Sequence, residues 1–332
     1  MFAAWLQRLW FEQRRLSPAL WLLVPLAWLY SFLAWLNRRK AAPVVLSVPV
    51  VVVGNITVGG AGKTPLTIWL AQQLQQRGWH PGVVSRGYGG THDAPQAVLK
   101  NASPANVGDE PVLLAQRSGV PVWVGRDRVA AAQALLAANS AVDLILCDDG
   151  LQHYRLSRDV ELAVFDQRGV GNGWRLPVGP LREPMVRLKA VDAVICNGAS
   201  DISLPEGTER FDMKLAAGQF YRLGQPEVRC EAHDLKDKKL FALAGIGDPG
   251  RFFRTLDGLG LTFDAHPFPD HHAYSPSDLA FAKDGILLLT EKDAVKCVGL
   301  MVGETWVLPV EAELSPALID HILEKLRGRK VA

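Results

Sequence analysis

Cysteine is scarce in this sequence, and the few cysteines lie far apart. The spacing of Cys147, Cys196, Cys230 and Cys297 fits neither a CxxC metal site nor a dense disulfide framework. We therefore expect reduced thiols in a cytosolic compartment. Internal repeats and low-complexity tracts are also lacking, and a chain with 48% hydrophobic and 21% charged residues is neither disordered nor collagen-like. With 332 residues it can form one large or two medium domains.

A broad basic surface is missing as well. Residues 1–40 carry six Lys or Arg against the single acidic residue Glu12, whereas the other 292 residues hold 30 basic and 33 acidic groups. Non-specific binding of nucleic acid needs a basic footprint that displaces counterions, so we expect no nucleic-acid partner. We also infer no obligate protein partner from the sequence.

The N-terminal forty residues contain a long hydrophobic run. From Leu16 to Asn37, 22 residues carry no charge, and basic residues flank the run at 14–15 and 38–40. As a helix at ~1.5 Å per residue, this run is long enough to cross a hydrocarbon core, and Pro25 predicts a kink in it. Upstream, apolar side chains recur at helical spacing, as in a helix that lies in a membrane interface: Phe2, Trp5, Leu6, Leu9 and Trp10.

Tryptophan also favours a membrane-associated helical segment over 1–40. Five of the ten tryptophans precede residue 36, and this side chain favours the headgroup layer. Trp21, Trp28 and Trp35 are seven residues apart and share one helical face. A buried core helix is the alternative, and a cleavable signal peptide is disfavoured because basic residues stand where its cleavage site would be. Whether the segment spans the bilayer or lies on it stays open.

The rest of the chain alternates β-branched runs with helical stretches, which predicts an α/β fold built on a parallel sheet flanked by helices. The first domain is expected over 41–204, with strands over 48–53, 81–85, 121–124, 142–147, 162–165 and 193–196. A smaller C-terminal α/β lobe is expected over 237–332, with strands over 240–244, 286–289 and 306–309. Residues 205–236 are rich in polar and turn residues and are predicted to link the two.

A glycine-rich segment follows the first of these strands and reads GNITVGGAGKTP from Gly54 to Pro65. Glycines let backbone amides surround phosphate oxygens, and the start of the following helix adds its positive end. In this P-loop pattern Lys63 binds the β- and γ-phosphates of a nucleotide and Thr64 binds Mg²⁺. The strict pattern has glycine at the position of Thr57, so a merely structural turn is the alternative. The predicted nucleotide-binding residues are Thr57, Val58, Gly59, Gly60, Ala61, Gly62, Lys63 and Thr64.

Two carboxylates end the apolar strand predicted over 142–147. Asp148 and Asp149 are adjacent like charges, and they repel unless a cation or a proton intervenes. A Mg²⁺ ion shared with ATP would supply that cation. The alternative is that one of the two only starts the following turn. The sequence therefore predicts ATP and Mg²⁺ as ligands of a P-loop NTPase-like domain, without deciding which carboxylate contacts the metal.

Taken together, the motifs closely resemble the tetraacyldisaccharide 4'-kinase family, and the resemblance covers nearly the whole chain. The segments that carry it are 54–65, Ser85-Arg86-Gly87-Tyr88-Gly89, Gly108-Asp109-Glu110-Pro111, Asp148-Asp149-Gly150-Leu151-Gln152-His153, Leu181-Arg182-Glu183, Ala244-Gly245-Ile246-Gly247, Asp270-His271 and Thr290-Glu291-Lys292-Asp293. The resemblance implies ATP-dependent phosphorylation of the 4'-hydroxyl of a tetraacylated glucosamine disaccharide 1-phosphate, at the cytoplasmic face of a Gram-negative inner membrane. Burial of acyl chains at ~0.8 kcal/mol per CH₂ keeps such a substrate in the bilayer, so the enzyme must come to it.

The resemblance also assigns roles to single residues. It implies that Asp109 is the catalytic base, oriented or tuned by His271, and that Lys63 acts on the phosphates. For Asp109, an ordinary helix N-cap is the alternative. Glu183 is implied as a further acidic group near the metal, although it fits equally a surface carboxylate paired with Arg182 or Arg187. The implied substrate-side residues are Arg128, which could grip the disaccharide or its 1-phosphate, and Arg86, Tyr88, Gln152 and His153.

Three other interpretations compete with a lipid kinase. A zinc site could be formed by His266, Asp270, His271 and His272, although one loop without a ligand framework makes it a weak hypothesis. A regulatory GTPase or a metal-insertion NTPase is suggested by the segment at 290–293, which is superficially similar to a guanine-reading TKxD element. A membrane-tethered scaffold could bind nucleotide without chemistry, and then Asp109 would be dispensable.

Overall fold

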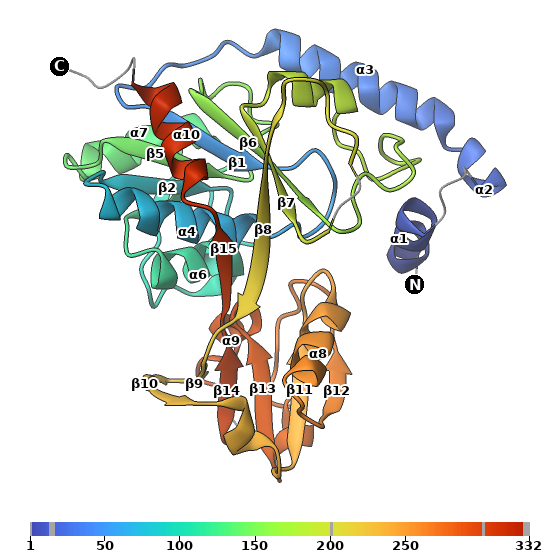
Figure 1. Ribbon diagram of the computed structural model, residues 1–332, viewed down its shortest axis with the longest axis vertical. Coiled ribbons are helices and arrows are strands. Elements are labelled where there is room, and N and C mark those ends of the chain that lie inside the picture. The colour runs from blue at the N-terminus through green and yellow to red at the C-terminus, as the bar shows by residue number, and fades with distance from the viewer. Residues whose placement is uncertain (1, 13–16, 200–201, 301–302, 328–332) are drawn as a thin grey trace.

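The computed structural model describes residues 2–12, 17–199, 202–300 and 303–327. A nine-stranded sheet with the order β15-β8-β7-β6-β1-β5-β2-β4-β3 forms the larger layer (Figure 1). Its parallel strands are β1 (Val50–Gly54), β2 (Pro81–Ser85), β4 (Val122–Val124), β5 (Leu144–Asp148), β6 (Val160–Asp166), β7 (Ala193–Asn197) and β8 (Glu209–Ala217). The antiparallel strands β3 (Gln96–Ala97) and β15 (Val310–Leu314) close the two edges. The predicted α/β fold with a large parallel sheet is confirmed.

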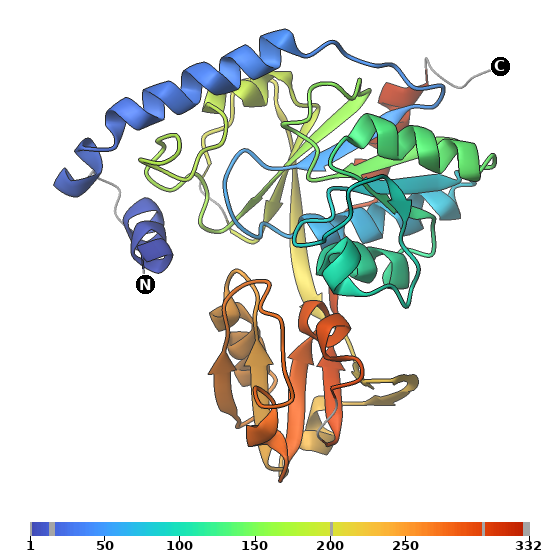
Figure 2. The same cartoon turned by 180° about the vertical axis from the view of Figure 1, so that it is seen from behind.

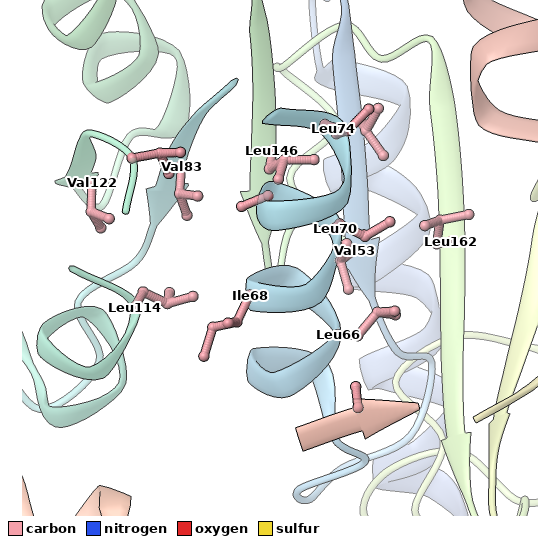
Figure 3. Close-up of a cluster of buried hydrophobic side chains, with 14 of the residues drawn as sticks. Val53, Leu66, Ile68, Leu70, Leu74, Val83, Leu114, Val122, Leu146 and Leu162 are labelled. Carbon is pink, nitrogen blue, oxygen red and sulfur yellow. The ribbon is translucent and has the colours of Figure 1, made fainter. Parts of the chain in front are cut away.

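Alternation along β1 explains how helices cover both faces of this sheet. Val51 and Val53 pack on one face with α4 (Lys63–Gln76), α6 (Asp109–Arg117) and α10 (Ala317–Leu326). Val50 and Val52 pack on the other with α7 (Arg128–Ala138) and the 3₁₀ helix η1 (Met185–Ala190). Figure 3 shows the first of these clusters, in which Leu66, Leu70 and Leu74 of α4 point toward the strands. Burial of these side chains at about 1.5–3 kcal/mol each fixes α4, and thereby the loop before it.

A smaller six-stranded sheet with the order β10-β9-β14-β13-β11-β12 forms the second lobe. Its parallel strands are β11 (Leu240–Ala244), β12 (Asp264–Pro267), β13 (Ile286–Thr290) and β14 (Thr305–Leu308), with the antiparallel hairpin β9 (Phe220–Arg222) and β10 (Gln225–Cys230) at one edge. The lobe also contains α8 (Pro249–Gly258), α9 (Glu291–Cys297), η2 (Ala232–Leu235) and η3 (Ala280–Ala282). The short helix α5 (Pro104–Val107) precedes α6 in the first lobe.

The lobe boundaries differ from those expected. The predicted linker over 205–236 contains β8, which pairs with β7 in the large sheet, and the β9–β10 hairpin of the small sheet. The predicted C-terminal lobe over 237–332 is too long at its end. Its last described elements, β15 and α10, belong to the first lobe. Two antiparallel strands, β8 and β15, therefore run between the lobes, as the views from both sides show (Figures 1 and 2). Strand β8 was not predicted because its residues near the edge of the sheet are only half buried. Polar side chains therefore alternate along it, and no continuous apolar run marks it as a strand.

The N-terminal segment is divided into separate helices and does not form one continuous helix. Helix α1 (Phe2–Phe11) is followed by α2 (Pro18–Trp21) and α3 (Val24–Lys40). Pro25 lies in the first turn of α3 instead of kinking a longer helix, because a proline there loses no hydrogen bond. Within the described ranges, no helix is both long enough and apolar enough to cross a bilayer. Arg14, Arg15 and Leu16, which flank or begin the hydrophobic run, lie outside the described residues.

One face of this segment packs on the body, and another is exposed. Leu9, Leu20, Val24 and Ala27 form a small core with Val178. Tyr30 donates a hydrogen bond of 3.2 Å to the carbonyl oxygen of Arg182. The opposite surface of the segment presents large apolar side chains to solvent, among them Trp21, Leu22, Leu26, Trp28, Leu29, Phe32, Leu33 and Trp35. Exposed apolar surface of this extent is typical of an interaction site.

Candidate active site

The P-loop lies between β1 and α4, and its backbone needs glycine at two positions. Gly59 and Gly62 have φ values of 104° and 95°, which side chains rarely adopt. Asn55 donates to the carbonyl oxygen of Gly59 at 3.3 Å, and Asn197 of β7 donates to that of Ala61 at 3.1 Å. These bonds hold the loop open before Lys63 starts α4, so its amides and the helix N-terminus form a cradle for an anion.

Thr57 is the departure from the strict P-loop pattern, and the structure gives a reason for it. The residue is buried and forms an antiparallel bridge with Leu181. A β-branched residue suits such an extended, paired position better than glycine does. The departure therefore lies where the loop is supported by the neighbouring 181–183 segment, and the loop from Val58 to Thr64 keeps its glycines.

Lys63 and the acidic end of β5 meet at the carboxyl edge of the sheet. Because β1 and β5 are adjacent, with Val53 opposite Asp148, the P-loop and the two carboxylates leave the sheet side by side. Nζ of Lys63 lies 3.5 Å from Oδ1 of Asp149 and 3.5 Å from Oδ1 of Asn55. Arg182 approaches Asp149 at 3.2 Å. Burial raises the pKa of Asp149, but the charges of Lys63 and Arg182 outweigh it and lower that pKa.

The pKa of Asp148 is shifted in the opposite direction from that of Asp149. Its side chain is 1% exposed, and its Oδ1 accepts a 3.4 Å hydrogen bond from the hydroxyl of Thr67. Burial and the nearby charge of Glu110 raise the pKa of Asp148 to about 7, with Lys63 opposing the shift. A divalent cation beside Asp148 and Asp149 would favour the ionised form of both.

The donor set fits Mg²⁺ better than zinc. Thr64 stands in the first turn of α4, and with two carboxylates it offers the few oxygen ligands that Mg²⁺ takes besides phosphate and water. Among the described residues, no group of three or more His, Cys, Asp and Glu side chains could hold a metal. His266 instead stacks on Phe281, and His272 lies 3.4 Å from Asp278, so the competing interpretation of a zinc site is not supported among the described residues.

Asp109 and His271 come from different lobes and meet. Asp109 is the first residue of α6 and is 4% exposed, and Nδ1 of His271 lies 3.1 Å from each of its carboxylate oxygens. Lys292 and Lys296 of α9 each lie 4.0 Å from Oδ2 of Asp109. Burial raises the pKa of Asp109, but the bond from His271 and the charge of Lys292 lower it overall. The same bond raises the pKa of His271.

Local geometry holds both members of the pair. Oδ1 of Asp109 accepts the N–H of Glu110 at 2.9 Å. The N-cap of α6 is Gly108, so Asp109 is not the ordinary N-cap that was the alternative for it. His271 has a φ of 60°, a rare conformation for a residue with a side chain. The ring of Tyr88, which is 60% exposed, lies 4.9 Å from the His271 ring. Lys292 links the chain neighbours of the pair, Glu110 at 3.1 Å and Asp270 at 3.0 Å.

Glu183 is buried in a hydrogen-bond network, with both oxygens bonded to protein groups. Gln152 donates to its Oε1 at 2.8 Å, and the hydroxyl of Tyr154 donates to its Oε2. Arg187 is within 3.4 Å of Oε2, so the ion pair named in the alternative interpretation is present, although Glu183 is buried rather than on the surface. Gln152 also donates to the carbonyl oxygen of Asn55 at 3.0 Å, which connects the network to the P-loop. A direct contact of Glu183 with the metal stays a prediction.

The substrate-side candidates are not all on the same surface. Arg128 is buried and donates to the carbonyl oxygens of Gly125, Arg126 and Asp149 at 3.3–3.5 Å. His153 lies 3.6 Å from Asp127, and burial together with the charge of Arg128 lowers its pKa to about 4. Arg86 and Tyr88 are exposed. Its buried position indicates that Arg128 supports the acidic turn at Asp149, whereas Tyr88 is exposed and can contact a ligand.

Several residues of the site were not predicted from the sequence. Asn55, Tyr154 and Lys296 each bond or pair with a predicted site residue. Only the spacing of Lys292 and Lys296, one helical turn apart, could have suggested that both face Asp109. The segment at 290–293 serves the fold. Asp293 is fully buried and accepts hydrogen bonds from the Gly245 amide at 3.0 Å and the Tyr274 hydroxyl at 2.8 Å, which argues against reading a guanine base.

Comparison with known proteins decides the family. The family model described as tetraacyldisaccharide-1-P 4'-kinase matches residues 19–327. The chain belongs to the tetraacyldisaccharide 4'-kinase family. It is 66% identical over 333 residues to a tetraacyldisaccharide 4'-kinase of Dechloromonas aromatica, covering 100% of both chains. It is 47% identical over 330 residues to one of Methylobacillus flagellatus, covering 98% of this chain and 96% of the relative.

A solved structure of the family resembles this fold. The crystal structure of LpxK from Aquifex aeolicus in complex with ATP superposes with a TM-score of 0.79 at 27% sequence identity, covering 92% of this chain and 99% of that one. The resemblance to tetraacyldisaccharide 4'-kinases predicted from the motifs is thereby confirmed.

Proposed function

We infer that this chain is an ATP-dependent kinase that phosphorylates the 4'-hydroxyl of a tetraacyldisaccharide 1-phosphate in lipid A biosynthesis. The observation that carries the mechanism is the contact between Asp109 and His271 across the two lobes, in a chain whose first lobe also holds the P-loop. We call the P-loop with Lys63 and the acidic end of β5 the first half-site, and the Asp109–His271 pair the second. The P-loop, Lys63 and the acidic end of β5 belong to the first lobe. The Asp109–His271 pair joins that lobe to the second. A kinase needs both a phosphate cradle and a group that receives the proton of the acceptor hydroxyl.

The first half-site holds the donor. Backbone amides of the loop and the ammonium group of Lys63, at the start of α4, would neutralise the phosphates of the bound nucleotide. Thr64, Asp148 and Asp149 would hold Mg²⁺, which when bound neutralises charge on the transferring phosphoryl group. Arg182 also contacts both carboxylate oxygens of Asp149, at 3.2 and 3.3 Å, so Asp149 keeps a second cationic partner when charges change beside Lys63.

The second half-site would activate the acceptor hydroxyl of the sugar. Asp109 is ionised over the physiological range because its pKa is lowered, and an ionised carboxylate can accept a proton from a sugar hydroxyl. His271 holds the carboxylate of Asp109 by a hydrogen bond. The same bond stabilises the negative charge of that carboxylate before the sugar hydroxyl binds. Tyr88, exposed beside His271, would offer an aromatic face to the sugar.

The N-terminal helices would bring the site to its substrate at the membrane surface. The exposed apolar face of α2 and α3 and the basic residues at the end of α3 suit the headgroup layer of a bilayer. We propose attachment without crossing, at the cytoplasmic face of the inner membrane. The hydrogen bond from Tyr30 to Arg182 supports this arrangement, because it ties α3 to the segment beside Asp149.

The test is a reaction with defined components. Purified full-length protein is incubated with ATP, Mg²⁺ and a lipid A precursor that lacks the 4'-phosphate, in detergent micelles, and the lipid is analysed by mass spectrometry. One added phosphate at the 4'-position is expected, and the Lys63→Ala variant is expected to form far less product in the same time. Slow hydrolysis of GTP in preference to ATP, with no lipid product, would instead support a regulatory GTPase.

A further inference from the structure

Arg168 lies directly over the P-loop. Strands β1 and β6 are neighbours, with Gly54 opposite Ala163, so the segments that follow them leave the same edge of the sheet. The guanidinium of Arg168, in the segment after β6, fills the space beside Gly59. A Cβ atom placed on Gly59 would lie 2.8 Å from Nη2 and 3.2 Å from Nη1 of Arg168.

Two neighbours fix this guanidinium in place. Asp166, which is buried, accepts hydrogen bonds from Nε of Arg168 at 2.9 Å and from Nη2 at 2.6 Å. The ring of Phe11, from α1, lies 4.7 Å from Cζ of Arg168. Within the described ranges, Nη1 has no hydrogen-bond partner, so one edge of the fork stays available to an anion.

The charge around Asp166 also favours an anion. Arg251 of α8 in the second lobe approaches Oδ2 of Asp166 at 3.7 Å, so one buried carboxylate faces two guanidinium groups. The second lobe touches the same loop at another point, because a Cβ atom on Gly247 would lie 3.8 Å from the amide nitrogen of Gly60. The two guanidinium groups outnumber the one carboxylate, so a net positive charge stands beside Gly59 of the P-loop in addition to that of Lys63.

We propose that Arg168 is a further nucleotide-binding residue, whose available edge contacts the triphosphate of ATP held in the P-loop. The inference rests on the function proposed above and adds a donor that the P-loop pattern does not include. Asp166 and Phe11 preorganise the guanidinium, so little side-chain entropy is lost when the phosphate binds. The alternative is a structural brace that only joins α1, Asp166 and the loop.

Arg168→Gln tests the proposal, with Arg210→Gln as a matched control. Arg210 also pairs with a carboxylate two residues away, Asp212 at 3.0 Å, but on an exposed part of β8. Affinities for ATP and AMP are measured by calorimetry, and melting temperatures show whether each variant is folded. Loss of a charge-assisted hydrogen bond predicts about 10- to 100-fold weaker ATP binding for Arg168→Gln, little change for AMP, and no change for Arg210→Gln.

A second measurement uses the unaltered protein, in case Arg168→Gln does not fold. Modification of arginines by phenylglyoxal is followed by peptide mass spectrometry with and without ATP, and ATP should protect Arg168 but not Arg210. Unchanged ATP affinity, an equal loss for ATP and AMP, or unprotected Arg168 would overturn the proposal. Lys63→Ala separates the two levels of inference: if it too retains ATP affinity, the P-loop assignment itself fails.

Discussion

Nδ1 of His271 lies 3.1 Å from both carboxylate oxygens of Asp109, although 162 residues separate them in the chain. The contact joins a loop of the second lobe to the first residue of α6 in the first lobe. The base of the proposed reaction is therefore complete only when the lobes are in contact. Lys292, which bonds to Glu110 and Asp270, supports the same junction.

Asp109→Asn should reduce kcat by about 10²- to 10⁴-fold, the usual contribution of a general base, with little change in ATP affinity. Asparagine keeps an oxygen that can accept the N–H of Glu110, so α6 should keep its start, while the melting temperature should fall modestly because the charge interactions with His271 and Lys292 are lost. Steady-state kinetics and nucleotide titration measure the two effects. Full activity of this variant would leave Asp109 only its structural bond with the N–H of Glu110, and equal losses in kcat and ATP affinity would indicate a role in nucleotide binding.

His271→Gln should move the acidic limb of the pH–rate profile to higher pH. The bond from His271 lowers the pKa of Asp109, so its removal means that the carboxylate becomes protonated at a higher pH. His233→Gln is the control, because His233 forms a comparable but exposed pair with Asp234. An acidic limb that stays in place would show that His271 does not tune the base.

The same pair should make stability depend on pH in a defined window. Asp109 has a lowered pKa in the folded protein, so its contribution is present above the ordinary value of 3.8 and is lost as pH falls through the lowered value. His271 has a raised pKa, so its contribution is present below the ordinary value of 6.5 and is lost as pH rises through the raised value. The difference in unfolding free energy between the unaltered protein and His271→Gln should be largest between pH 3.8 and 6.5 in denaturant titrations.

Lys63→Ala should lower turnover by about 10²- to 10³-fold, because the developing charge on the phosphates loses a fixed cation. The variant also removes the partner of Asp149, so the pKa of Asp149 should rise. Lys189→Ala, at an exposed position of η1, is the control and should leave turnover unchanged. Normal kinetics in Lys63→Ala would refute the P-loop assignment.

Replacing the exposed aromatic face of α3 should release the protein from membranes. Trp28, Phe32 and Trp35 are exposed, and their joint replacement by Gln removes apolar surface without touching Leu20, Val24 and Ala27, which pack on the body. Co-sedimentation with vesicles of phosphatidylethanolamine and phosphatidylglycerol measures the effect. Val298→Gln, on an exposed site of the second lobe, should not change it.

Deletion of residues 1–40 is a less specific variant for the same question. Trp10 donates a hydrogen bond of 3.1 Å to the carbonyl oxygen of Pro177, and Val178 packs against the N-terminal helices. Their removal would uncover apolar surface on the body and create new attachment. Unchanged sedimentation of the Gln variant would show that other surfaces hold the protein on the bilayer.

The P-loop, the acidic strand end and most strands of the two sheets could be predicted from local sequence. Strand β2 over Pro81–Ser85 and β11 over Leu240–Ala244 have the expected limits, because continuous apolar runs bounded by turn residues specify buried strands. Strands β8 and β15 could not be predicted in the same way. Their side chains are partly exposed, so no apolar run marks them, and only pairing with β7 and with each other makes them strands.

The sequence by itself determined the backbone and charge of the glycine-rich loop at 54–65, because glycines before a lysine and a threonine fix backbone conformation and charge within a dozen neighbouring residues. It also determined the apolar character of the N-terminus, since hydropathy is a local property. Only the tertiary structure decided that Asp109 meets His271, that Arg168 covers Gly59, and that both oxygens of Glu183 are bonded to protein groups. Those relationships depend on how two lobes and two sheet edges pack, and distances between residues far apart in the chain are set by that packing rather than by their neighbours in sequence.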